Sequence, residues 1–72
     1  MQLKSLKIQY NAALARYSKM EQWCETATEE EQLKNYKHVL VVINTCNRLL
    51  NQIKEIDPLV TPQEILYGFK EV

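Results

Sequence analysis

The stretch KHVLVVINTCNRLLNQI, residues 37–53, decides the fold of this 72-residue chain. It places five apolar residues side by side, from Val39 to Ile43, within a sequence that otherwise mixes apolar and polar residues. Because neighbouring residues of an α-helix point about 100° apart, such a run spreads apolar side chains around much of the helix surface. What covers those side chains is the main structural question that the sequence raises.

The apolar residues in and around this stretch form two rows on a helix, here called the first and second seams. The first seam contains Leu33, Tyr36, Leu40, Ile43 and Leu50. The second seam contains Val39, Val42, Cys46, Leu49, Ile53 and Ile56. Val41 belongs to neither seam and lies among polar residues. The two seams cover roughly 220° of the helix, whereas one neighbouring helix needs a stripe of about 100°, so two neighbours are expected.

Two long helices are predicted from periodicity and from their end signals. Apolar residues recur in steps of three and four at Leu3, Leu6, Tyr10, Ala13, Tyr17, Met20, Cys24 and Ala27. This spacing predicts a helix over about residues 3–25. Thr28 and Glu31 have the spacing of a capping box, and the residue before Pro58 is pushed out of helical geometry. A second helix is therefore predicted over about residues 28–56.

A short third helix is predicted over about residues 62–70. Its start has the spacing of a second capping box, Thr61 to Glu64, with proline at the first helical position. Leu66 and Phe69 are expected to point inward. The short connection between the two long helices makes them an antiparallel hairpin, in which we expect the first seam to face the first helix. The sequence thus predicts one all-α domain spanning residues 1–72.

The second seam is expected to bind another copy of the chain. The third helix is about 13 Å long against about 42 Å for the second helix, so it can cover only one end. Contiguous exposed apolar surface usually marks an interface. The predicted self-association residues are Val39, Val42, Cys46, Leu49 and Ile53, and a two-fold dimer would give a four-helix bundle. The alternatives are a monomer whose third helix folds back along the second helix, and a larger or hetero-oligomeric assembly.

Composition and charge disfavour several classes of protein. Nine basic and nine acidic residues cancel, so no general attraction to polyanions is expected. Two cysteines do not make a disulfide framework, the first residues lack a signal-peptide pattern, and the longest apolar run is far shorter than a membrane span. A cytoplasmic protein without a membrane segment is therefore expected.

The search for catalytic chemistry is negative. His38 is the one histidine, and no nucleophile or carboxylate has a spacing that would make it a general base. The acidic run Glu29–Glu31 is explained by the start of the second helix, where negative charge is favourable. Cys24 and Cys46 are interpreted as small apolar residues. We expect no enzymatic activity, no cofactor and no metal.

Two sets of residues are candidates for binding a partner. Ile8 and Trp23 lie on a weaker stripe of the first helix and are candidate protein contacts, because tryptophan is frequent where a few residues dominate binding. Four cations gather at the open end of the predicted hairpin and are candidate anion contacts: Lys4, Lys7, Arg48 and Lys54. Without a helix-turn-helix pattern or a glycine-rich phosphate loop, nucleic-acid binding is the less favoured interpretation.

The C-terminal stretch TPQEILYGF, Thr61–Phe69, together with the long hairpin before it, resembles small uncharacterised helical proteins of phages and mobile elements of Gram-positive bacteria. The resemblance implies an accessory role through binding a host or element-encoded protein. The function we favour is a homodimeric, non-enzymatic interaction module that regulates or inhibits a protein partner through an exposed helical face. The alternative is a nucleic-acid-associated accessory factor that uses the basic open end.

Overall fold

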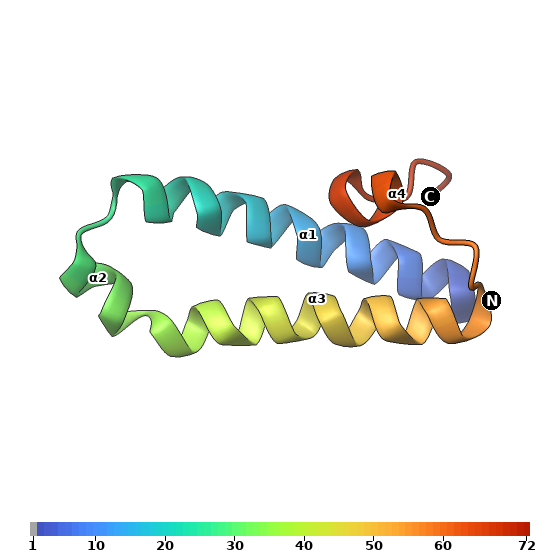
Figure 1. The fold of residues 1–72 in the computed structure, drawn as a ribbon, viewed down its shortest axis with the longest axis horizontal. Helices are drawn as coiled ribbons and strands as arrows, with labels where there is room; N and C mark the ends of the chain where they lie inside the picture. The colour runs from blue at the N-terminus through green and yellow to red at the C-terminus, as the bar shows by residue number, and fades with distance from the viewer. Residues whose placement is uncertain (1) are drawn as a thin grey trace.

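A computed structural model describes residues 2–72 of the chain. Within this range the elements are α1 (Gln2–Thr26), α2 (Glu29–Lys34), α3 (Tyr36–Ile56) and α4 (Pro62–Tyr67), with no β-strand among them. Helices α1 and α3 lie antiparallel, and α4 turns back to lie beside the N-terminal half of α1 (Figure 1). The all-helical class, the long helix pair and the short C-terminal helix are thereby confirmed.

The two short helices begin at the predicted caps. The hydroxyl of Thr61 accepts a hydrogen bond from the Glu64 N–H, and the Glu64 carboxylate accepts one from the Thr61 N–H, which completes the capping box of α4. At α2 only one of the two capping-box hydrogen bonds is present: the Thr28 hydroxyl accepts from the Glu31 N–H. The Glu31 carboxylate accepts from the Thr28 hydroxyl and not from the Thr28 backbone N–H. Gly68, with φ of 88°, ends α4 in a conformation that favours glycine.

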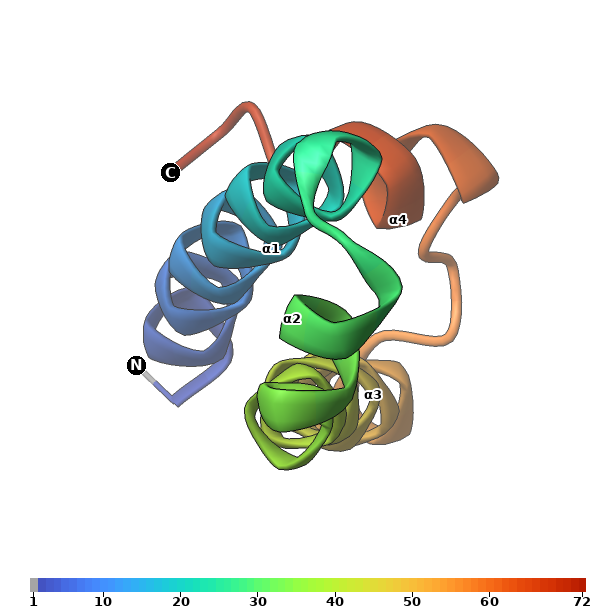
Figure 2. The same cartoon turned by 90° about the vertical axis from the view of Figure 1, so that its left-hand side faces the viewer.

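The prediction of one continuous helix over residues 28–56 is wrong at Asn35. This residue has φ −104° and ψ 10°, and it separates α2 from α3. The side-chain amide of Asn35 donates a hydrogen bond to the Glu31 carbonyl at 2.9 Å. The backbone N–H of Asn35 donates to the same carbonyl. Asparagine side chains compete with helical backbone bonding in this way. The result is that α2 bends away from the line of α3 (Figure 2).

The predicted roles of the two seams are reversed over most of their length, although Leu50 of the first seam packs against the core and Ile56 of the second seam is 48% exposed. Val42, Leu49 and Ile53 of the second seam are buried, and the last two share one core cluster with Leu6, Tyr10, Ala13 and Phe69. On the first seam, by contrast, Leu33 is 75%, Tyr36 57% and Leu40 38% exposed. Burying the first seam would also remove a tyrosine hydroxyl from water, whereas the second seam contains aliphatic residues and one thiol. Its burial therefore leaves fewer polar groups to satisfy.

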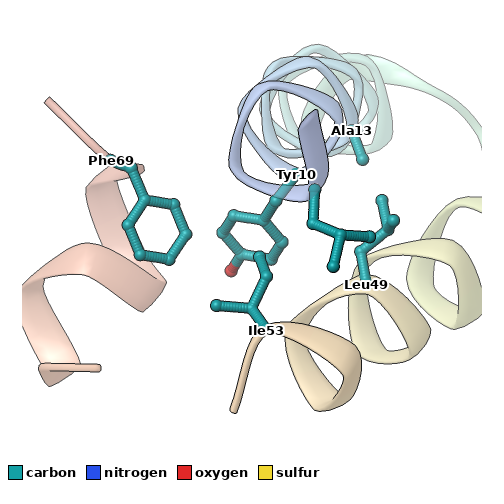
Figure 3. Close-up of a cluster of buried hydrophobic side chains, with 6 residues drawn as sticks. Tyr10, Ala13, Leu49, Ile53 and Phe69 are labelled. Carbon is teal, nitrogen blue, oxygen red and sulfur yellow. The ribbon is translucent and has the colours of Figure 1, made fainter. Parts of the chain in front are cut away.

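The core lies at the open end of the hairpin, where α4 closes it (Figure 3). Ile53 is fully buried there, and the rings of Tyr10 and Phe69 meet edge to face with centroids 5.7 Å apart. Phe69 points inward as predicted, but Leu66 is 66% exposed, which corrects the expectation for that residue.

No helix formed by residues 2–72 combines the length and the apolar character needed to cross a membrane.

Candidate binding surfaces

The C-terminal segment is held on α1 by a set of specific hydrogen bonds. The Asn11 side chain donates to the carbonyl of Phe69 at 2.9 Å and accepts from the Phe69 N–H at 2.7 Å. The Tyr10 hydroxyl donates to the carbonyl of Ile65 at 2.6 Å. A Cβ on Gly68 would lie 2.7 Å from the Asn11 side-chain oxygen, so this close approach requires glycine. We call this arrangement the C-terminal clasp.

Lys7 belongs to the same clasp, which corrects its assignment as an anion contact. Its ammonium pairs with the Glu71 carboxylate and lies 5.0 Å from the centre of the Phe69 ring. The residue is only 8% exposed. The hydrogen bond to Glu71 raises the pKa of Lys7 and outweighs the opposing effect of burial. Of the four cations at this end, the exposed ones are therefore Lys4, Arg48 and Lys54.

The first seam without Leu50 forms one candidate surface, here called the uncovered face. It comprises the apolar residues Leu33, Tyr36, Leu40 and Ile43 of α2 and α3, extended by Leu66 and Tyr67 of α4. A hollow of about 440 Å³ joins the two parts and is lined by Ile43, Leu66, Tyr67 and Tyr17 among others. A hydrogen bond to the Glu21 carboxylate is the main cause of the raised pKa of Tyr17. The face is thus mostly apolar, with a tyrosine of α1 at its border.

A second candidate surface lies between α1 and α2–α3 near the turn, and we call it the turn-end cleft. Its volume is about 700 Å³, and apolar residues from both long helices line it, among them Met20, Trp23, Val39 and Val42. Arg16 and Lys19 supply cations, His38 supplies an imidazole ring, and Glu31 supplies the one carboxylate. Clefts of this size that are mostly apolar and have a few polar groups are typical binding sites.

The predicted site residues are distributed over different parts of the fold. Cys46, Leu49 and Ile53 pack in or against the core, which corrects their assignment to a self-association surface. Val39 and Val42 line the turn-end cleft. Trp23 lines the same cleft, whereas Ile8 is 51% exposed and fifteen residues earlier on α1, about 22 Å away along the helix. Ile8 and Trp23 therefore do not form one contact site.

Two further kinds of chemistry-bearing group are the cysteines and the side chains that commonly bind metal ions. Cys24 and Cys46 are free and half-buried. Burial raises the pKa of the Cys46 thiol, which keeps it in the less nucleophilic protonated form. No group of three or more histidine, cysteine, aspartate or glutamate residues within the described range could hold a metal ion.

The sequence contained one signal for the turn-end cleft. Val41 fitted neither seam, and the structure places it at the cleft, 61% exposed. An apolar residue outside every predicted contact can indicate a surface that was not considered. No feature of the sequence indicated the role of Asn11, because its side chain hydrogen-bonds to the backbone of Phe69, 58 residues later in the chain.

Comparison of the chain with protein-family models, with curated proteins and with solved structures found no match. Function is therefore inferred from the two surfaces.

Proposed function

We propose that this protein is a non-enzymatic interaction module that forms a reversible homodimer through the uncovered face. The observation that carries the proposal is the exposure of Tyr36 and Leu40, four residues apart on α3, with the half-buried Ile43 three residues further along the same row. Such an apolar row is the packing surface that a helix presents to another helix. The short helix α4 lies at the open end of the hairpin (Figure 1), and Tyr36 and Leu40 nearer the turn stay 57% and 38% exposed.

A second copy suits this face because a two-fold axis would bring the same row of each protomer together. Burying the exposed parts of these side chains in both copies would contribute on the order of 10 kcal/mol. The loss of translational and rotational freedom on association is of similar size. A gain that exceeds this loss by about 4 kcal/mol corresponds to a dissociation constant near 1 mM, so a weak dimer is expected. As an accessory protein, such a dimer would act on a partner protein as a regulator or inhibitor.

The alternative function, nucleic-acid association, has less support. Lys7 is one of the four cations on which it depended, and its ammonium is engaged by Glu71 and covered by the C-terminal segment. Electrostatic binding to phosphates depends on the number of available cations.

The test is the molar mass of the protein by multi-angle light scattering from micromolar to millimolar concentration. The native chain should move from monomer to dimer, and Leu40→Glu should remain monomeric, because it places a charge in the middle of the face. Leu59→Glu is the matched control, since Leu59 is 83% exposed in the α3–α4 connection and outside the face. A native chain that stays monomeric at millimolar concentration, or equal effects of the two variants, would contradict the proposal.

A further inference from the structure

The turn-end cleft is a different surface from the uncovered face. Thr45 lines the cleft and Tyr36 belongs to the face, and the two are nine residues apart on α3. Nine steps of about 100° place them on opposite sides of the helix. A dimer formed through the face would therefore leave the cleft open. We propose that the turn-end cleft binds an amphipathic α-helix of another protein, one that carries acidic residues beside its apolar stripe.

The lining of the cleft favours a helix as the occupant. It is formed by side chains of α1, α2 and α3 and by Asn35 between the last two. The backbone groups of the helices are already hydrogen-bonded, so the cleft has no strand edge to which an extended peptide could pair. Its lining residues on α1 extend from Ala13 to Trp23, about 15 Å or nearly three helical turns. A helix laid between α1 and α3 would complete a three-helix arrangement at the turn end, as α4 does at the open end.

The charges that line the cleft favour acidic residues on the part of that helix that faces Arg16 and Lys19. Arg16 and Lys19 of α1 line the cleft, and neither forms a salt bridge within residues 2–72. Glu31 is the one carboxylate in the lining. Unpaired cations beside an apolar floor attract a segment with the opposite charge and disfavour a basic one. Trp23, a residue type that often dominates binding, lies in the same lining.

The chain provides its own probe for this proposal, because Trp23 is its single tryptophan. Binding can be followed by tryptophan fluorescence with synthetic helical peptides that contain neither tryptophan nor tyrosine. Three peptides of about four helical turns are needed. The acidic peptide has a leucine stripe flanked by glutamates, and the basic peptide has the same stripe flanked by lysines. The scrambled peptide has the composition of the acidic one in an order that removes the stripe.

The acidic peptide should bind about three- to tenfold more tightly than the basic one at low salt, as two exposed charge pairs would give. The double variant Arg16→Glu/Lys19→Glu should reverse this preference. The matched control Lys4→Glu/Lys54→Glu carries the same charge change at exposed positions outside the cleft lining and should leave the preference unchanged. Circular dichroism of each variant verifies that the fold is retained.

Several outcomes would overturn the proposal. They are the absence of binding at millimolar peptide, equal binding of the striped and scrambled peptides, and a charge preference that the Arg16→Glu/Lys19→Glu variant does not change. A concentration-dependent shift of Trp23 emission in the Leu40→Glu variant without peptide would assign the cleft to a second copy instead. Repeating the titration with the monomeric Leu40→Glu variant separates the two proposals, because peptide binding should persist when dimerisation is lost.

Discussion

Both ends of the hairpin contain apolar residues, but these residues are buried at the open end and exposed at the turn end. At the open end, Ile53, Tyr10 and Phe69 are all less than 4% exposed, and the C-terminal clasp fixes α4 over them. At the turn end, Leu33 and Tyr36 face solvent, and a cleft separates α1 from α3. The position of α4 therefore determines which end of this small protein has a core and which end has exposed binding surfaces.

The largest contrast is expected from truncating one apolar residue at each end. Ile53→Ala should lower the free energy of unfolding by about 2–5 kcal/mol, because it leaves a cavity in the core. Leu33→Ala, at the turn end, should change it by less than about 0.5 kcal/mol. Urea denaturation followed by circular dichroism at low micromolar concentration measures both. Similar losses for the two variants would show that the turn end is as well packed as the open end.

A smaller loss is expected from breaking the C-terminal clasp. Asn11→Ala removes both bonds to Phe69 and should lower the free energy of unfolding by about 1–3 kcal/mol, because it leaves buried backbone groups unpaired. Hydrogen exchange of the Phe69 amide should accelerate more than that of core amides in α3. Asn44→Ala, at an exposed position of α3, is the control and should leave this amide protected.

Alkaline pH should loosen the open end. Burial raises the pKa of Cys46 and Tyr10 from their ordinary values of 9.0 and 10.0 by favouring their neutral forms. Glu71 raises the pKa of Lys7 from 10.5 by favouring its charged form. Each of these groups makes its full contribution to the free energy of unfolding at a pH below its ordinary pKa. That contribution is lost as the pH rises through the pKa of the folded state.

The free energy of unfolding should therefore decline as the pH rises above about 9, as urea titrations up to about pH 11 would measure. Lys7→Met should weaken the decline above the ordinary pKa of lysine. If the native chain and the variant have the same profile throughout this range, Lys7 makes no such contribution.

The smallest effect is expected at the helix break. Asn35→Ala removes the side-chain bond to the Glu31 carbonyl but also improves helix propensity, so the free energy of unfolding should change by less than about 0.5 kcal/mol. The backbone Cα chemical shifts of residues 34–36 should become more helical as α2 joins α3. Unchanged shifts would show that packing at the turn end, and not Asn35, imposes the break.

The sequence by itself determined the all-helical structure and most helix limits, except for the break at Asn35. The periodicity of apolar residues predicted α1 and α3, and the short-range capping signals at Thr28 and Thr61 predicted where α2 and α4 begin. These features depend on residues three or four positions apart, so a single chain contains all the information they require. The total apolar arc of α3 likewise showed that one neighbour cannot cover it.

Only the tertiary structure decided which seam is buried. Both seams have helical spacing, and the choice between Val42 and Leu40 as the residue facing α1 depends on how α4 and α1 pack around α3 together. The Asn11–Phe69 bonds and the turn-end cleft also join residues distant in sequence. Periodicity reports the directions in which a helix is apolar, whereas the neighbour in each direction is set by packing of the whole chain.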